Sequence, residues 1–429
     1  MKRSSNPERG VPGRVALLWD ESFLWGLMAY KALQSAPLPF DLIRSEEIKA
    51  GRLEGYQVLL VPGGWASNKL KSLGDGGSDA IKGFVRNGGA YLGFCGGAGL
   101  ATLDGIGLLN VKRKATKERV PSFSGRITLS LSASPLWCGI SEPVFQAWWP
   151  SQLVLGDSRV KVLAAYGEAL PDSFSSDINV GDVERHGSWS SLENLYRINL
   201  DPGRLLHDPA VLEGCFGKGR VILSLVHFDT PGDRDGSTVL RNLWEYLGVK
   251  IDGRIPSEGR QRNGRHLPDD ETLLLVSGLR GLCEELISLG IRNLLWLWRN
   301  RMLLRWRRGV RGLEYCTLYG MIKEIERIMK ARRALPGANG AATGESPLPL
   351  KDRLLRIRAS MVPFTEKAGR LLILERQEMN KGYITYESCD DPEIRELRKE
   401  LFSDSKSHGG LFKTLIDEVD ALLYSLLRA

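Results

Sequence analysis

Short apolar runs alternate with helix-like patterns between residues 14 and 250. The apolar runs predict buried strands, and the amphipathic stretches between and after them predict helices. The predicted strands are Arg14–Trp19, Phe40–Arg44, Val58–Val61, Ala90–Phe94 and Arg220–Val226, and the predicted helices are Ser22–Leu33, Ser78–Asn87 and Ser237–Leu247. Residues 120–200 are richer in β-type patterns, with strands expected at Arg126–Leu131 and Leu153–Ala165. This alternation predicts an α/β fold in which helices cover both faces of a mainly parallel sheet.

The period of the apolar residues becomes helical after residue 268. Leucines at positions 275, 279, 282, 286 and 289 follow helical spacing, and a second pattern predicts a long helix from Ile291 to about Met329. The C-terminal residues are again helical in pattern, and Asp391-Pro392-Glu393 is a typical helix start. Polar stretches at 253–268 and 334–350 predict linkers. We therefore expect an N-terminal domain at 1–252, a basic helical region at 269–333 and a C-terminal helical region at 351–429.

The charge of the chain is concentrated in one segment. The protein has 429 residues, 26% of them charged, and a net charge of +8. Residues 1–253 are close to neutral and residues 334–429 are close to neutral as well, so the excess lies in residues 254–333. A basic surface of general nucleic-acid-binding type is therefore not expected on the N-terminal domain, and no nucleic acid is expected as a partner.

The cysteines indicate a reducing environment. All six are far apart, none forms a Cys-x-x-Cys pair, and no Cys/His spacing is that of a zinc site, so we expect neither a disulfide framework nor a metal nor a cofactor. The basic start of the chain lacks the apolar core of a signal peptide, and no run of about 18 apolar residues exists. A cytoplasmic location is the expectation.

The strongest chemical signal is the run Gly93-Phe94-Cys95-Gly96-Gly97, which follows the predicted strand Ala90–Phe94. A nucleophile between glycines at a strand-to-helix turn is typical of a nucleophile elbow, where small neighbours avoid clashes. The start of the following helix would favour the thiolate, and the Gly96 amide would face a developing oxyanion. The alternative is a buried, inert cysteine beside a glycine-rich turn.

Two further motifs follow strands of the same predicted sheet. His227-Phe228-Asp229 comes after Arg220–Val226 and would provide a base and the acid that orients it. Pro62-Gly63-Gly64 follows Val58–Val61, where a glycine amide can supply a second oxyanion donor. The alternatives are a surface His and Asp at a loop, and an ordinary turn.

The order of these motifs resembles that of the class I glutamine amidotransferase-like superfamily. The string GGAYLGFCGGAGLA at Gly88–Ala101, with Phe145–Gln152 and Leu223–Pro231, is most similar to the N-terminal domain of eukaryotic-type biotin-protein ligases. The resemblance covers about residues 13–250 and implies a flavodoxin-like three-layer sandwich. No ligase catalytic domain is expected, because the Arg-rich run Gly259–Arg265 precedes helical patterns instead of strands.

The resemblance also implies roles for individual residues. Cys95 would be the nucleophile, His227 the base, Asp229 its partner, and Gly64 and Gly96 the oxyanion hole, with Gly63, Gly93 and Gly97 forming the turns. Amidotransferases usually have Glu where this chain has Asp229, which is one methylene shorter. In a related protease and deglycase branch an acid near the position of Glu21 touches the cysteine, which makes Glu21 a secondary candidate.

Two functions from different classes remain open. One is a cysteine-dependent hydrolase of a small amide or peptide, such as glutamine. The other is a catalytically degenerate module that binds such a ligand and has a regulatory role. The segment Ile291–Arg311 has seven Arg and no acid, so as a helix it would pack in a bundle, lie on an anionic membrane as a peripheral anchor, or bind a partner protein.

Overall fold

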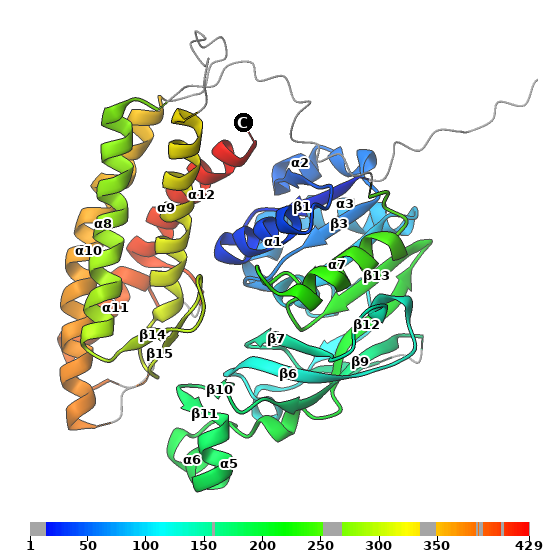
Figure 1. Ribbon diagram of the computed structural model, residues 1–429, viewed down its shortest axis with the longest axis horizontal. Helices are drawn as coiled ribbons and strands as arrows, with labels where there is room; N and C mark the ends of the chain where they lie inside the picture. Colours follow the sequence, from blue (N-terminus) through cyan, green and yellow to red (C-terminus); the bar gives the residue numbers. More distant parts are fainter. Residues whose placement is uncertain are drawn as a thin grey trace, which may run out of the picture. The chain divides into compact units, whose positions relative to one another are not determined.

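The computed structural model describes residues 14–156, 159–251, 268–334, 349–382, 385, 389–404 and 407–428. The chain divides into two compact units, Met1–Glu258 and Gly259–Ala429 (Figure 1). Most of both predicted linkers, at 253–268 and 334–350, lies outside the described residues, as does the run Gly259–Arg265.

Five parallel strands form one half of the sheet in the first unit. They lie side by side in the order β13 (Gly219–Ser224), β4 (Ala90–Phe94), β3 (Val58–Val61), β1 (Val15–Leu18) and β2 (Asp41–Ile43). Strands β1, β3 and β4 are buried along their whole length, which explains why their sequences are uninterrupted apolar runs. The predicted α/β fold with its parallel sheet is confirmed.

Helices cover this half of the sheet as the alternating pattern predicts. Helix α1 (Phe23–Ser35) packs with α7 (Arg234–Tyr246), and α2 (Ser45–Lys49) packs with α3 (Ala66–Arg86) (Figure 1). Helix α3 begins well before the predicted start at Ser78. It runs through a glycine-rich stretch, where it has a kink at Gly74. The short helix α4 (Gly96–Leu100) follows β4 directly.

Antiparallel strands extend the sheet beyond β13. The β-rich region predicted at 120–200 contains β6 (Phe123–Leu131), β7 (Val144–Trp148), β9 (Lys161–Ala169), β10 (Phe174–Ser175) and β11 (Ile178–Asn179), and β12 (Pro209–Phe216) joins β9 to β13. The single strand predicted at Leu153–Ala165 is wrong: β8 (Leu153–Leu155) leaves the sheet to pair with β5 (Val111–Arg113). Helices α5 (Val180–His186) and α6 (Trp189–Tyr196) follow β11, and short 3₁₀ helices lie at Arg52–Gly55, Thr116–Glu118, Pro135–Trp137 and Pro202–Leu205.

The second unit is a helical bundle. Helices α8 (Asp270–Arg292), α9 (Gly312–Arg333), α12 (Gly410–Arg428) and α10 (Leu350–Lys381) pack in a closed ring, with α11 (Pro392–Phe402) against α10 and α12. The bundle core is aromatic, with Tyr315, Phe364, Phe402 and Phe412 in edge-on and tilted contacts. The predicted start of α11 is confirmed, since the Asp391 carboxylate accepts the amides of Glu393 and Ile394 at 2.8 and 3.2 Å.

The long helix predicted from Ile291 to Met329, which includes the basic helix Ile291–Arg311, is wrong. Helix α8 ends at Arg292, and a hairpin of β14 (Trp296–Trp298) and β15 (Leu304–Trp306) comes before α9. The Leu295 amide donates to Gly290 and the Leu294 amide to Ile291, the pattern of a Schellman helix end. Leu294 has a φ of 55° at the position where glycine is usual, so the sequence carries no glycine signal for this end.

Tryptophans explain why the hairpin folds back on the helices. Trp296 and Trp306 are cross-strand partners, and each ring covers a glycine of a flanking helix, Gly290 of α8 and Gly312 of α9. A Cβ on Gly290 would lie 2.0 Å from the Trp296 ring, and one on Gly312 would lie 2.5 Å from Trp306. The indole of Trp296 also donates to the Ile287 carbonyl at 2.9 Å. Packing of these two rings therefore overrides the helical spacing of the leucines between them.

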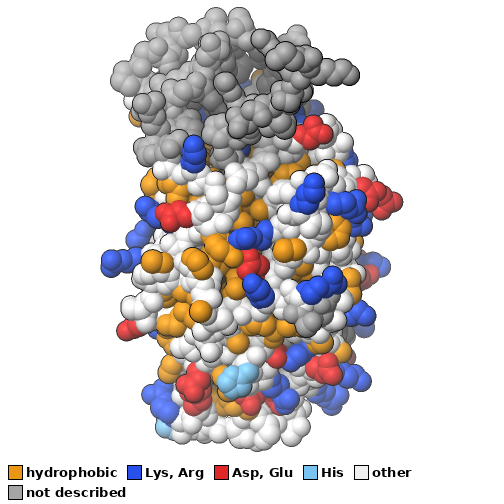
Figure 2. Space-filling view, turned by 90° about the vertical axis from the view of Figure 1, so that its right-hand side faces the viewer, with side chains coloured by type: hydrophobic (Ala, Val, Ile, Leu, Met, Phe, Trp, Pro, Cys, Tyr) orange, Lys and Arg blue, Asp and Glu red, His pale blue; other side chains and the backbone are white. Residues whose placement is uncertain are grey.

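Charged side chains of both signs are mixed on the surface (Figure 2), and the cysteines are unpaired. Lys and Arg side chains are scattered among acidic and apolar ones on the face of the molecule drawn in Figure 2. All six cysteines are free, and Cys138 and Cys215 are exposed. In the described part of the chain, no helix is both long and apolar enough to cross a membrane.

Candidate active site

The carboxyl ends of the parallel strands meet at one edge of the sheet. The turn after β1 contains Glu21, the loop after β3 contains Gly64, Cys95 follows β4, and His227 comes shortly after β13. Because these strands are parallel neighbours, residues far apart in the chain are brought to the same edge, which is where sites in such sheets lie.

Cys95 sits in a sharp and strained turn. Its φ and ψ are 49° and −105°, a region that residues with a Cβ rarely occupy. Its amide donates to the Ser224 carbonyl of β13 at 2.8 Å, which fixes the turn to the neighbouring strand. A Cβ on Gly96 would lie 1.7 Å from the Gly64 oxygen and one on Gly97 2.0 Å from the Val61 oxygen. The two glycines therefore allow the backbone of the turn to approach the backbone of β3 and its loop.

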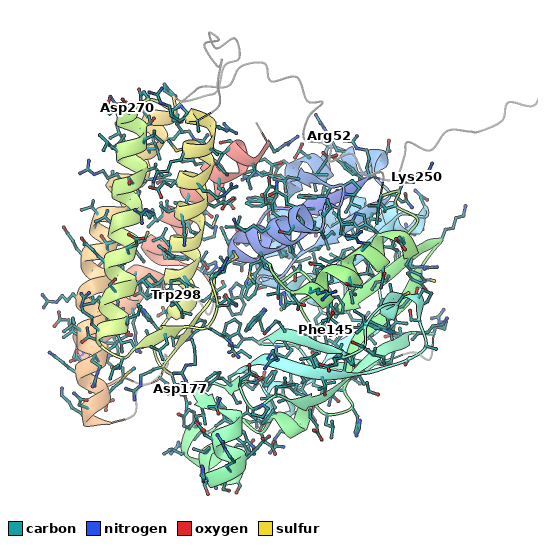
Figure 3. The ribbon with its side chains drawn as sticks, viewed as in Figure 1. Arg52, Phe145, Asp177, Lys250, Asp270 and Trp298 are labelled. Atoms are coloured by element: carbon teal, nitrogen blue, oxygen red, sulfur yellow. The ribbon has the colours of Figure 1, made fainter. Side chains whose placement is uncertain are left out.

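His227 and Asp229 form a buried pair. Both side chains are 1% exposed, and His227 Nδ1 lies 2.8 Å from Asp229 Oδ1, so the shorter Asp side chain does reach the imidazole. Between them, Phe228 is buried and packs edge-on against Phe145 at 4.9 Å; Phe145 is labelled in Figure 3. His227 and Asp229 lie in the turn that follows β13, and their side chains face each other.

The electrostatics of the pair favour a charged imidazole. Burial lowers the pKa of His227, but the charge and hydrogen bond of Asp229 and the nearby sulfur of Cys95 outweigh it and raise the pKa to about 10. Cys95 is half-buried, and its thiol donates a long hydrogen bond to the Trp148 carbonyl at 3.8 Å. His227 Nε2 is buried, and the sulfur of Cys95 is the neighbour besides Asp229 that raises the pKa of the imidazole.

The loop after β3 lies against both the His227 ring and the Cys95 turn. A Cβ on Gly63 would lie 3.2 Å from His227 Cε1 and 3.1 Å from the Trp25 ring. Gly64 has a φ of 109° and is in contact with Gly96. Gly64 and Gly96, the two predicted members of the oxyanion hole, are thus neighbours, and both are partly exposed to solvent.

Backbone strain gathers around the site. Besides Cys95, the non-glycine residues with positive φ include Glu21, Phe23 and Trp149, at 54°, 46° and 50°. The Glu21 backbone oxygen would lie 2.6 Å from a Cβ on Gly64, and its carboxylate accepts a hydrogen bond from Asn68 at 3.2 Å. Glu21 therefore supports the loop of Gly64. Strain of this kind persists where surrounding packing enforces it, and it is typical of functional sites.

The segment from the 3₁₀ helix Arg52–Gly55 to the residues after α4 contains the Gly63-Gly64 loop and the Cys95 turn. Residues 53–104 match the family described as biotin-protein ligase, N terminal. This segment is similar to the N-terminal domain of biotin-protein ligases. The resemblance predicted from the motifs is confirmed over these residues. No curated protein sequence matches the chain.

The first unit also has likenesses among solved structures. A glutamine amidotransferase is 20% identical, with 55% of this chain and 99% of that chain covered and a TM-score of 0.36. PurLQS from Thermotoga maritima is 15% identical, with coverages of 55% and 100% and a TM-score of 0.38. A β-galactosidase from Bacillus circulans sp. alkalophilus is 16% identical with a TM-score of 0.36, and the match covers 56% of this chain but only 32% of that one. At such identities and TM-scores, none of these likenesses bears on activity or substrate.

Residues outside the biotin-protein-ligase-like segment complete the site, and several lack a signal in the sequence. Trp25 of α1 covers the His227 ring at 5.1 Å and meets Trp149 edge-on at 6.1 Å. Tyr166 of β9 is fully buried, and burial together with the charge of Cys95 raises its pKa well above the usual value. The run Phe145–Gln152, noted for its resemblance, supplies Trp148 and Trp149, whereas nothing in the sequence marks Trp25 or Tyr166.

Lys69 is the least expected member of the site. It lies within the biotin-protein-ligase-like segment, on α3, and its side chain is fully buried. Its Nζ donates to the Asp20 carbonyl at 3.2 Å and to Ser22 Oγ, and it would lie 3.6 Å from a Cβ on Gly64. Lys69 therefore ties the strained turn after β1 to the loop of Gly64. Its buried amino group is satisfied by the Asp20 carbonyl and the Ser22 hydroxyl, both distant in the sequence, so residue patterns give no indication of it.

Proposed function

We propose that the first unit is an amidotransferase-like hydrolase in which Cys95 attacks a small amide, such as glutamine, or a short peptide. The observation that carries this proposal is the strained Cys95 turn beside an imidazole that Asp229 holds at 2.8 Å. A nucleophile, a base and a residue that orients the base are the parts that acyl transfer requires.

The proposed reaction begins with the thiolate of Cys95 and the imidazolium of His227. Sulfur attacks the amide carbonyl carbon, and the Gly64 and Gly96 amides stabilise the oxyanion that forms. The C–N bond then breaks, the His227 proton goes to the leaving amine, and a thioester remains on Cys95. Water attacks the thioester while His227 accepts a proton, which releases the carboxylic acid and restores the starting pair.

The raised pKa of His227 supports the charged form of this pair. An imidazolium beside a thiolate is the reactive state of cysteine hydrolases. A reducing compartment such as the cytoplasm would keep Cys95 available as a thiol, and all six cysteines are free. The substrate determines which acid is produced and which molecule accepts the amine. Ammonia release from a panel of amides identifies that substrate.

Alkylation by iodoacetamide tests the nucleophile against internal controls. Cys138 and Cys215 are exposed, whereas Cys95 is half-buried, so accessibility alone predicts slower reaction at Cys95. We expect Cys95 to react roughly tenfold faster than either control at neutral pH, because the thiolate is the reacting species. His227→Gln removes that advantage, and Asp229→Asn reduces it.

Hydrolysis is tested by release of ammonia from glutamine and from a panel of small primary amides. Wild-type protein should release ammonia, Cys95→Ser should not, and Cys138→Ser should behave as wild type. Alkylation of Cys95 no faster than that of Cys138 contradicts the proposal. Fast alkylation without hydrolysis, together with a ligand-dependent melting temperature that Cys95→Ala alters, would instead assign the unit a binding role.

A further inference from the structure

We propose that the β14–β15 hairpin docks this protein on an anionic lipid surface. The segment predicted as a basic helix is a hairpin in the structure, and several of its apolar side chains are exposed. The hairpin surface is defined here by three apolar and three basic side chains, all exposed, which are Leu294, Leu297, Trp298, Arg292, Arg301 and Arg307.

The apolar members are exposed at a cost that packing does not explain. Leu294 is 65% exposed, Leu297 48% and Trp298 38%. Leu294 also holds a positive φ, a conformation that disfavours any residue with a Cβ. A strained backbone that presents a large aliphatic side chain to solvent points to a role for that side chain outside the fold.

The two faces of the hairpin differ: the face with Trp296 and Trp298 packs on the helices, and the face with Leu297 is exposed. Because side chains alternate along a strand, Leu297 lies on the face opposite Trp296 and Trp298 and pairs with Arg305 across the ladder. Trp298, labelled in Figure 3, lies over the Tyr319 ring at 5.6 Å, and Lys323 lies over the same ring at 5.2 Å. Leu294 and Leu297 are therefore the apolar groups open to a partner, and the apolar part of a lipid layer can take them up while its headgroups meet the arginines.

The charge of the hairpin surface fits anionic headgroups. No acidic residue occurs from Ile291 to Arg311. Within the described residues, Arg292, Arg301 and Arg307 form no ion pair, in contrast to Arg311, which pairs with Glu314 at 3.0 Å. Trp and Tyr side chains beside Arg and Lys are the usual composition at a membrane–water interface.

Co-sedimentation of the full-length protein with vesicles tests the proposal. We expect binding to vesicles of equimolar phosphatidylserine and phosphatidylcholine, weaker binding at high salt, and little binding to phosphatidylcholine alone. Arg301→Gln and Arg307→Gln should each weaken binding about fivefold. Leu297→Ser combined with Trp298→Ser should abolish binding. Leu297→Ser alone, which leaves the Trp298–Tyr319 contact in place, should weaken binding with the melting temperature unchanged.

Matched controls lie on the helices of the same unit. Leu274→Ser removes a leucine that is 73% exposed on α8, and Arg356→Gln removes an exposed charge on α10; neither should change sedimentation. Brominated lipid should quench part of the tryptophan fluorescence of wild type but less in Trp298→Phe, which retains binding. Equal losses in the Leu274→Ser control, equal binding to neutral vesicles, or binding of polyglutamate in place of vesicles would each overturn the proposal.

Discussion

Cys95 and Leu294 hold nearly the same unusual φ, 49° and 55°, each directly beyond a regular element. At Cys95 the strain is enforced from all sides, because neighbouring backbone lies against Gly96 and Gly97 and Ser224 holds the amide. At Leu294 only the end of α8 imposes it, and the side chain is in solvent. Strain in the first unit is therefore part of a packed arrangement, whereas strain in the second unit can be removed without disturbing a core.

The largest effect is expected from Gly97→Ala in the first unit. The new Cβ would lie 2.0 Å from the Val61 backbone oxygen, and backbone cannot rotate away as a side chain can. We expect a loss of about 3 kcal/mol in the free energy of unfolding, measured by urea denaturation.

Gly99→Ala is the matched control for this change. Its Cβ would lie 3.5 Å from the Ala66 side chain, an ordinary contact, on the same helix α4. Alanine there should be neutral or slightly stabilising, since it favours the helix. Equal effects at the two positions would mean that the packing around the Cys95 turn is not what enforces its conformation.

A smaller effect is expected from the pH dependence of the His227–Asp229 pair. The pKa of His227 is raised to about 10 in the folded chain, above its ordinary value near 6.5. Its stabilisation is therefore complete below about pH 6.5 and is lost as pH rises through about 10. The stability difference between wild type and His227→Gln should shrink between these limits by at least about 1.4 kcal/mol, the equivalent of one pKa unit.

Urea denaturation at several pH values checks this change, with His186→Gln measured alongside as the removal of an exposed imidazole. A difference between wild type and His227→Gln that stays constant between these limits would mean that the imidazole is neutral in the folded state. That result would argue against the proposed ion pair with Cys95.

The smallest effect, and the one of opposite sign, is expected from Leu294→Gly. Glycine accepts the positive φ without strain, and the leucine side chain makes little contact, so stability should rise by about 0.5–1 kcal/mol. Leu294→Ala retains a Cβ and should give no gain. Thermal unfolding of the two variants separates these outcomes, and a loss of stability with glycine would show that the side chain is needed by the fold.

Much of the first unit could be predicted from its sequence, for a physical reason. Strands buried on both faces require continuous apolar runs, and Val58–Val61 and Ala90–Phe94 match β3 and β4 residue for residue. The start of α3 could not be predicted, because a kink at Gly74 allows the helix to continue where glycines indicate its end. The hairpin could not be predicted, because it depends on the packing of Trp296 on Gly290 and of Trp306 on Gly312. Local sequence patterns do not indicate such tertiary contacts.

Some residues of the candidate site could likewise be predicted from the sequence, and others could not. Glycines around Cys95 are required by close backbone approach, so the motif itself carries the information. His227 and Asp229 are marked by their place in the turn directly after the buried strand β13. Lys69 and Trp25 reach the site through contacts with segments distant in the chain, such as Asp20 and His227. Their roles depend on the folded arrangement alone.

The pairing of β13 with β4 also has a consequence for the order of synthesis. Strand β13 is the last strand of the first unit along the chain, yet it lies in the middle of the sheet beside β4. A nascent chain therefore presents Cys95 long before His227 exists, and until β13 arrives the edge of β4 is unpaired and open to wrong partners. Any fragment that ends before Gly219 would keep the cysteine but lose its base, so the candidate chemistry is available only to a chain whose first unit is complete.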